Sequence, residues 1–236
     1  MGTQVQLEVP GIGPIGGWLA RPEGTPRGAL VVVQEIFGVN AHIRAVTDRY
    51  AADGLLALAP ALFDPVRPGA ELAYDEPGFA AGRALAAELG FDRAVAIVEA
   101  AAARLRSLVD ASGAPPASGA PVAVVGFCWG GSVAFLANTR LGLPAVSYYG
   151  ARTVPFLGEA LRAPMLFHFG ARDASIPEAD IQAHRRAQSG AELHVYDAGH
   201  GFNRDVDPRH HDAASARLAH ARTLDFLQRA FAAAGH

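Results

Sequence analysis

The chain has 236 residues, half of them hydrophobic, and a formal net charge of −3 at pH 7. This length can bury one sizeable core, so we expect a single domain over residues 1–236, and the slightly acidic balance excludes bulk attraction to nucleic acid. All 20 basic residues are arginine, which excludes Schiff-base chemistry and phosphate binding by a P-loop lysine.

The sequence also limits the cellular setting. The N-terminal segment MGTQVQLEVPG lacks the basic and apolar regions of a secretory signal, and no apolar run is long enough to span a bilayer. Cys128 is the only cysteine, so an internal disulfide and a paired-cysteine metal site are both excluded. We therefore expect a cytoplasmic protein that does not bind membranes.

The first half of the chain alternates strand-like and helix-like patterns. We expect strands over 3–9, 15–20, 28–33 and 55–59, and helices over 40–53, 79–89 and 91–109. Asn40 is the expected N-cap of the first helix, and Gly90 separates the last two. The segment 60–78, rich in Pro, Gly and Asp, has a length that usually serves function.

The second half continues the alternation after a connection over 110–121 that we expect to be flexible. We expect strands over 122–125, 143–149, 164–169 and 191–196, and helices over 131–140, 154–161, 176–189 and 212–233. Such alternation predicts an α/β protein whose mostly parallel central sheet is covered by helices on both faces.

The segment PVAVVGFCWG, residues 121–130, carries the strongest chemical signal. A buried strand enters a tight turn and then a helix, with Cys128 where a Gly-x-nucleophile-x-Gly elbow places its nucleophile. Gly126 and Gly130 supply the small residues that this turn requires. The helix start is an electropositive environment for a thiol. A buried structural cysteine is the alternative.

Functional residues of a parallel sheet gather beyond the carboxyl ends of its strands. Asp173 and His200 follow two later strands, which gives the order nucleophile, carboxylate, histidine of α/β-hydrolases. Cysteine would attack a carbonyl carbon, histidine would move the proton, and the carboxylate would orient the imidazole. Glu178 and Asp180 compete with Asp173, which could instead cap a helix, and His200 could be a structural turn residue.

Four other histidines fit structural roles. His168 and His194 lie in predicted strands and are expected to pack, whereas adjacent His210 and His211 point in different directions and are expected at the surface. No metal site is expected. An oxyanion hole needs two backbone N–H groups, for which we predict Trp129, next to the nucleophile, and Ile36, after the third strand.

Five motifs, in this order, resemble the dienelactone hydrolase family: QEIFG at 34–38, GFCWGG at 126–131, YYG at 148–150, GARD at 170–173 and AGHGF at 198–202. The resemblance covers nearly the whole chain. It implies an α/β-hydrolase fold and a Cys-Asp-His triad that opens a carboxylate-bearing enol lactone, as carboxymethylenebutenolidase does in the degradation of aromatic compounds. It implies no cofactor.

The resemblance also implies roles for three charged residues. Glu35 would hold the resting thiol and help to release a thiolate, while Arg204 and Arg83 would bind the substrate carboxylate; a solvated carboxylate and surface charges are the alternatives. Two positions depart from the family pattern: Gly201 stands where a serine is expected, and Ala87 where a tyrosine is expected. These departures bear on the substrate.

The sequence thus predicts a monomeric hydrolase of a small lactone or ester, acting through a thioester on Cys128. A short-chain esterase with the same machinery is the first alternative; only the lactone hypothesis needs cations facing a bound acid. A non-catalytic binding module would require Asp173 and His200 to lie apart from Cys128. A thiol redox sensor would need neither the triad nor the elbow.

Overall fold

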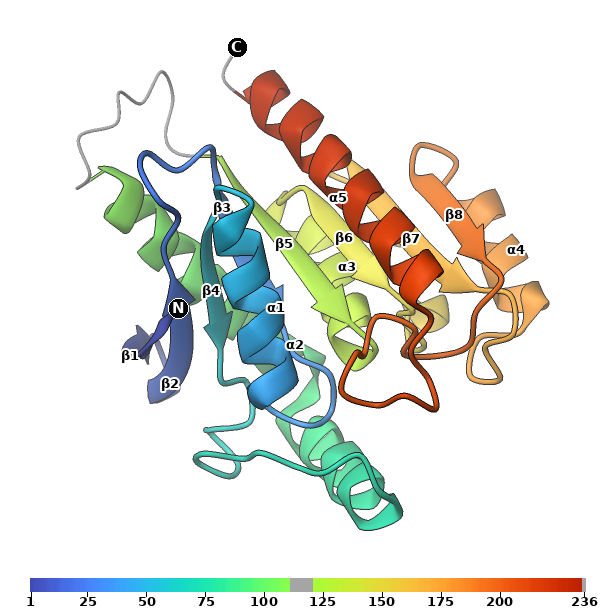
Figure 1. Ribbon diagram of the computed structural model, residues 1–236, viewed down its shortest axis with the longest axis horizontal. Coiled ribbons are helices and arrows are strands. Elements are labelled where there is room, and N and C mark those ends of the chain that lie inside the picture. Colours follow the sequence, from blue (N-terminus) through green and yellow to red (C-terminus); the bar gives the residue numbers. More distant parts are fainter. Residues whose placement is uncertain (111–120, 235–236) are drawn as a thin grey trace.

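The computed structural model describes residues 1–110 and 121–234, so the connection expected over 110–121 lies almost wholly outside the described residues. One eight-stranded sheet forms the centre, in the order β1-β2-β4-β3-β5-β6-β7-β8 (Figure 1). The strands are β1 Thr3–Val9, β2 Gly13–Ala20, β3 Ala29–Val33, β4 Leu56–Pro60, β5 Val122–Phe127, β6 Ala145–Tyr148, β7 Met165–Gly170 and β8 Glu192–Tyr196.

The sheet is parallel from β4 to β8, and the hairpin β1–β2 joins β4 in antiparallel orientation. Every residue of β3, β4, β5, β6 and β7 is buried. These strands are continuous apolar runs because helices cover both of their faces. The predicted α/β architecture is therefore confirmed.

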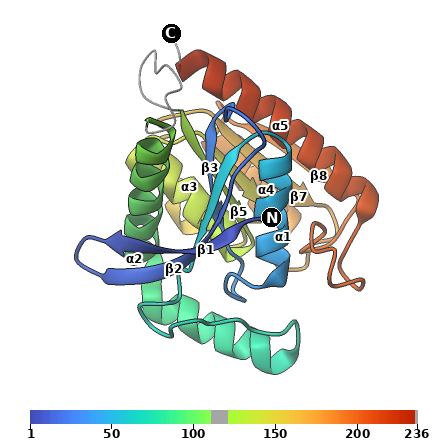
Figure 2. The same cartoon turned by 60° about the vertical axis from the view of Figure 1, so that its left-hand side comes forward.

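Five α-helices and one short 3₁₀ helix are found in the described part of the chain. They are α1 Ala41–Ala52, α2 Glu76–Asp110, α3 Trp129–Leu141, η1 Val154–Phe156, α4 Glu178–Ala187 and α5 Ala213–Ala234. Helices α1 and α5 cover one face of the sheet, and α2 and α3 cover the other (Figures 1 and 2). Helix α4 shares the face of α3, since His184 and Phe135 both contact the ring of Phe167.

Helix α2 has the predicted break. Gly90 adopts φ 74° and ψ 163°, a left-handed φ that favours glycine, and it divides the helix into two segments. The first segment lies beyond the carboxyl ends of the strands, and the second packs on the sheet (Figure 1). Ala94, Ile97, Val98, Ala101 and Leu105 of the second segment are fully buried, and Leu108 is partly buried.

The predicted cap of α1 and the predicted helix over 154–161 had different outcomes. Asn40 caps α1 as predicted, because its side-chain oxygen accepts a hydrogen bond from the Ile43 N–H. The helix expected over 154–161 is wrong in length: only η1 forms, and Gly158, just beyond it, is a weak helix former. No helix in residues 1–110 or 121–234 is long and apolar enough to cross a membrane.

Candidate active site

Cys128 occupies a strained turn between β5 and α3. Its backbone has φ 55° and ψ −122°, an uncommon conformation for a residue with a side chain. A Cβ atom added at Gly126 would lie 1.9 Å from the Gly130 carbonyl oxygen, and one added at Gly130 would lie 2.3 Å from the Gln34 carbonyl oxygen. Both flanking positions therefore require glycine, as the elbow pattern predicts.

Asp173 and His200 come together from the loops after β7 and β8. The His200 Nδ1–H donates to Asp173 Oδ2 at 2.7 Å, while Asp173 Oδ1 accepts from the Ser175 N–H at 2.8 Å. Asp173 is only 4% exposed, and these two donors fix the orientation of its carboxylate. This hydrogen bond selects the imidazole tautomer that leaves Nε2 available for proton transfer.

The charge environment favours a protonated His200. Burial alone would lower the pKa of His200, but the Cys128 side chain and the hydrogen bond to Asp173 outweigh it and raise that pKa to about 10. The imidazolium form of His200 is therefore stabilised beside the Cys128 side chain.

Cys128 and His200 line one cavity of about 730 Å³. Ile36 and Trp129, the predicted oxyanion residues, line it too, and so does Arg83. The volume falls in the range of small-molecule sites, roughly 300–1,000 Å³. Cys128, His200 and the loop after β3 therefore face the same space, although they come from three separate parts of the chain.

Aromatic side chains form one wall of this cavity. Phe91 stacks on Trp129 with ring centroids 5.7 Å apart and meets Phe156 edge-on at 5.2 Å. Phe91 follows directly after Gly90, so the break in α2 delivers its ring to the cavity. Sequence analysis did not single out Phe91 or Phe156, whose contact joins residues 65 positions apart.

Glu35 and Arg204 are joined to each other rather than to the cavity. Arg204 donates from Nε to Glu35 Oε2 at 3.0 Å and from Nη2 to Oε1 at 2.8 Å. Glu35 is 0% and Arg204 1% exposed, and neither lines the cavity. Burial opposes ionisation of Glu35, but the charge and hydrogen bonds of Arg204 hold its pKa below the ordinary value.

This ion pair changes the expectation for both residues. A guanidinium buried against Glu35, with the rings of Phe37 and Tyr74 at 5.3 and 4.7 Å, has no side open to a substrate carboxylate. The two Glu35 oxygens likewise serve Arg204 and do not hold the thiol in this conformation. In this structure Arg204 is therefore paired with Glu35, and its role toward a substrate carboxylate stays a prediction.

The structure shows the surroundings of Gly201 and Ala87, the two positions that depart from the family pattern. Gly201 has φ 77°, and a Cβ atom there would lie 3.0 Å from the Arg204 guanidinium carbon, so a side chain would be strained. Ala87 lines the cavity one helical turn after Arg83, where its methyl group leaves room that a tyrosine would fill. Of the two positions, only Ala87 lines the Cys128 cavity.

The other candidate carboxylates and histidines from the sequence lie outside the Asp173–His200 hydrogen bond. Asp180 lines the cavity but lies on α4, while Glu178 bonds Gln182. His168 is fully buried and contacts Tyr196 and Thr223, whereas His194 is only partly buried. His210 bonds Asp207, and no group of three metal-ligating side chains occurs among the described residues.

Sequence analysis also missed Arg152. This residue lines the cavity from the loop between β6 and η1, two positions after the YYG motif. The motif drew attention to the strand end but carried no information about the direction of the following side chains.

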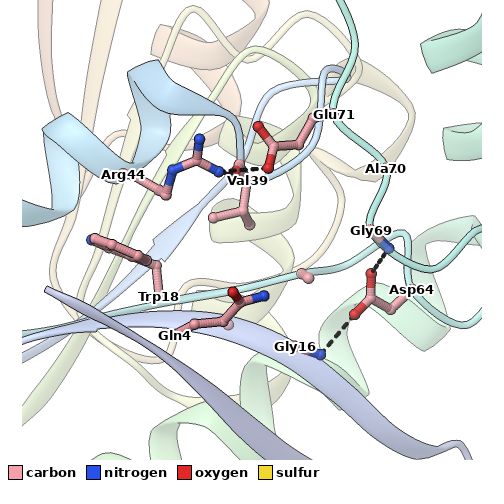
Figure 3. A pocket seen from close by; sticks show the side chains of 11 residues that line it. Gln4, Gly16, Trp18, Val39, Arg44, Asp64, Gly69, Ala70 and Glu71 are labelled. Carbon is pink, nitrogen blue, oxygen red and sulfur yellow. Dashed lines mark hydrogen bonds and ion pairs between the residues drawn. The ribbon is translucent and has the colours of Figure 1, made fainter.

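A second cavity, of about 330 Å³, lies between the β1–β2 hairpin and the 60–78 segment (Figure 3). Its charged side chains are already satisfied: Arg44 pairs with Glu71 at 2.6 Å, and Asp64 accepts from the N–H groups of Gly16 and Gly69. It contains no nucleophile beside a base, so the Cys128 cavity is the candidate active site.

Comparison with known proteins identifies relatives that match most of the chain. Residues 15–231 match the model of the dienelactone hydrolase family. Carboxymethylenebutenolidase 1 of Cupriavidus pinatubonensis is 32% identical over 221 residues, covering 91% of this chain and 92% of the relative. Carboxymethylenebutenolidase of Pseudomonas putida is also 32% identical over 221 residues, covering 90% of each.

Solved structures agree with these sequence relatives. A crystal structure of a candidate dienelactone hydrolase from Klebsiella pneumoniae superposes with a TM-score of 0.77 at 29% identity, covering 96% of this chain and 98% of that one. A dienelactone hydrolase from Anabaena variabilis, at 18% identity and a TM-score of 0.66, covers 96% and 97% and shows the same fold.

Proposed function

The chain belongs to the dienelactone hydrolase family, with the α/β-hydrolase fold of that family, and we propose that it opens a small enol lactone or ester through a thioester on Cys128. Membership makes the protein a hydrolase; the cysteine mechanism and the lactone are the proposal. The observation that carries it is the strained elbow at Cys128 facing the Asp173–His200 hydrogen bond in one cavity.

In the acylation step Cys128 reacts as the thiolate, and His200 is the imidazolium that later gives up its proton. The Cys128 sulfur attacks the carbonyl carbon, and the carbonyl π electrons move to the oxygen, which accepts hydrogen bonds from the N–H groups of Ile36 and Trp129. When the carbonyl re-forms, the bond to the ring or alkoxy oxygen breaks, and His200 gives that oxygen its proton. The product is a thioester; for a lactone, the leaving oxygen stays on the same molecule.

In the deacylation step His200 acts as a base instead of an acid. Neutral His200 takes a proton from a water molecule while the water oxygen attacks the thioester carbon, and the carbon–sulfur bond then breaks to release the acid and the Cys128 thiolate. Asp173 stabilises the imidazolium in each half-reaction. No cofactor enters these steps.

The Glu35 proposal depends on a conformational change. If Glu35 tunes the thiol, its carboxylate must exchange the Arg204 guanidinium for Cys128 during the cycle. Its lowered pKa makes this carboxylate an anion at neutral pH, so it could accept the thiol proton only after losing the Arg204 charge. Substrate binding is the event that the family resemblance assigns to this exchange.

A short-chain esterase is the second candidate function. The cavity is wide, and the absence of a side-chain hydroxyl at Ala87, which lines it, removes a polar contact that could select one lactone. Arg83 supports the lactone, since it lines the cavity and can bind a carboxylate through two parallel hydrogen bonds.

Hydrolysis of a dienelactone by wild type, Cys128→Ala and Glu35→Gln tests the proposal. We expect turnover that Cys128→Ala abolishes and Glu35→Gln reduces. If the enzyme hydrolyses p-nitrophenyl esters but not the dienelactone, and this activity depends on Cys128, the short-chain esterase would replace the lactone hydrolase as the proposed function. Absence of thiol-dependent hydrolysis of either substrate would favour the non-catalytic binding module.

Three further properties are proposed: the cellular compartment, the number of domains and the oligomeric state. An unpaired cysteine is typical of proteins in reducing compartments, which supports a cytoplasmic location. The unbroken eight-stranded sheet supports a single domain over residues 1–236. We also propose that the enzyme works as a monomer: the Asp173–His200 hydrogen bond and Cys128 come together at one cavity within a single chain.

A further inference from the structure

Tyr149, the residue after β6, is held in a strained conformation beside the candidate nucleophile. Its φ is 41°, and Cys128 is the only other non-glycine residue with a positive φ in the described part of the chain. The Cys128 N–H donates to the Tyr148 carbonyl at 3.0 Å, and the Tyr149 N–H donates to the His168 carbonyl at 2.8 Å. Strain of this kind persists only where the surrounding structure enforces it, and it concentrates at functional sites.

The Tyr149 side chain is fully buried, yet its hydroxyl has no hydrogen-bond partner. The ring meets His200 edge-on with centroids 5.1 Å apart and meets Phe202 at 5.2 Å, and the residue is 0% exposed. Within residues 1–110 and 121–234 no group bonds the hydroxyl. Buried hydroxyls normally have a partner, because leaving water without a replacement is costly. Tyr149 therefore holds an unused donor beside His200.

The surrounding charges place this hydroxyl near the Glu35–Arg204 pair. Burial and the charge of Glu35 raise the pKa of Tyr149 well above its ordinary value, while the charge of Arg204 opposes the rise. The phenol thus keeps its proton at neutral pH and can only be used as a hydrogen-bond donor or acceptor. Tyr149 does not line the Cys128 cavity, so the Glu35 carboxylate is a better candidate for its acceptor than a bound substrate.

Glu35 needs a donor whenever it leaves Arg204. Both of its oxygens bond the guanidinium in this structure, and a buried carboxylate without a partner is strongly disfavoured. Tyr74 is the other tyrosine beside Glu35, but its hydroxyl is already engaged, since it accepts from Asn40 Nδ2 at 3.0 Å. The hydroxyl of Tyr149 is the one that has no other partner.

We propose that Tyr149 is a positioning residue: its O–H donates to one oxygen of Glu35 when this carboxylate leaves Arg204, and the other oxygen accepts from the Cys128 S–H. The inference rests on the proposed function, because it gives Glu35 the role of tuning the thiol. Tyr149 acts through Glu35 and makes no contact with the ester. In the arrangement in which Glu35 bonds Arg204, the same O–H has no acceptor, which accounts for its missing partner.

Tyr149→Phe tests the proposal, because it removes the hydroxyl and keeps the ring against His200. With enzyme in excess over p-nitrophenyl acetate, the release of p-nitrophenol reports the acylation of Cys128. We expect the rate constant at saturating enzyme to fall about ten- to a hundredfold, as the loss of a hydrogen bond to a charged group predicts, with an unchanged half-saturating concentration. The midpoint of urea unfolding should not fall, because the lost hydroxyl has no partner in the folded protein.

Tyr196→Phe is the matched control. The Tyr196 hydroxyl bonds Nδ1 of the fully buried His168 at 2.8 Å, and Tyr196 lines neither the Cys128 cavity nor the second cavity. Its removal should lower the urea midpoint and leave the acylation rate unchanged, because it deprives a buried group of its partner far from the ester. The two variants should therefore show opposite patterns.

The Glu35→Gln background tests whether Tyr149 acts through Glu35. Adding Tyr149→Phe to Glu35→Gln should slow acylation by less than about twofold, because residues that act through one another are not additive. A slowing as large as in the wild-type background overturns the route through Glu35.

The remaining outcomes separate this inference from the proposed function. A Tyr149→Phe protein that acylates as fast as wild type, or that loses stability together with activity, overturns the role of the hydroxyl, while release of p-nitrophenol that depends on Cys128 still supports the hydrolase. Absence of Cys128-dependent release in wild type overturns the proposed function and this inference with it.

Discussion

At the scale of single residues, the Cys128 side chain and the hydrogen bond to Asp173 raise the pKa of His200 and so set its protonation. The raised His200 pKa, about 10, means that the imidazolium is present below that pH and is lost as pH rises through it. His200 therefore stabilises the fold fully below its unfolded pKa of about 6.5, and this contribution disappears near pH 10.

The pH dependence of activity follows from the same shift. We expect kcat/KM to stay high through neutral pH and to fall near pH 10, where the imidazolium can no longer protonate the leaving oxygen. Asp173→Asn should move that fall to lower pH and reduce kcat by about 10³–10⁴-fold, because the orienting charge is lost. An unchanged profile in Asp173→Asn, measured with Asp180→Asn as control, would remove Asp173 from the mechanism.

The buried Glu35–Arg204 pair makes a prediction about stability. Glu35→Gln leaves the Arg204 charge without its partner in the interior and should cost about 3–5 kcal/mol of unfolding free energy at neutral pH. Because the pKa of Glu35 is lowered on folding, its contribution is present above about pH 4.5 and is lost as pH falls. The variant should therefore lose stability less steeply in acid than wild type.

Glu71→Gln provides the comparison in urea denaturation. Its ion pair with Arg44 is half exposed, so this change should cost less than about 1 kcal/mol. Equal losses in the two variants would show that burial of the Glu35–Arg204 pair does not strengthen it.

At the scale of elements, the break in α2 shapes the cavity. Gly90→Ala forces a side chain into φ 74° and ψ 163°, a conformation almost confined to glycine, and should cost about 1–3 kcal/mol. It should also disturb the position of Phe91 and raise KM for the esters. Gly158→Ala is the control, because Gly158 has open space and no left-handed φ. A Gly90→Ala protein as stable as wild type, with unchanged KM, would mean that the break is not required.

The sequence predicts elements better than it predicts contacts. Apolar runs bounded by glycine predict where all eight strands lie along the chain, and the spacing around Cys128 predicts the elbow, because these signals are local. Ends differ by a few residues, and 154–161 shortens to η1. The Glu35–Arg204 pair joins residues 169 positions apart, and no local pattern indicates whether an arginine turns toward a cavity or a buried carboxylate.

At the scale of the whole molecule, one sheet connects the hairpin at one edge with β8 at the other. If residues 1–236 form one domain, the chain should unfold in one cooperative transition. Trp18 in β2 and Trp129 at the start of α3 allow separate tests in Trp129→Phe and Trp18→Phe. Each fluorescence transition should coincide with that of circular dichroism in the same variant; two resolved midpoints would divide the chain.

The fold as a whole serves to bring distant loops together at one edge of the sheet. Ile36, Cys128, Asp173 and His200 follow four different strands, and the parallel arrangement places all four strand ends on one side. Arg83 reaches the same cavity from the first segment of α2. The central claim is that this assembly forms a thioester on Cys128.

Mass spectrometry of the intact protein during turnover of a slow ester tests that claim most directly. The account predicts a mass increase equal to the acyl group, mapped to the peptide that contains Cys128, removed by hydroxylamine and absent from Cys128→Ala. His200→Ala should form the adduct more slowly. An acyl group on another residue, or continued hydrolysis by Cys128→Ala at the wild-type rate, would contradict the account.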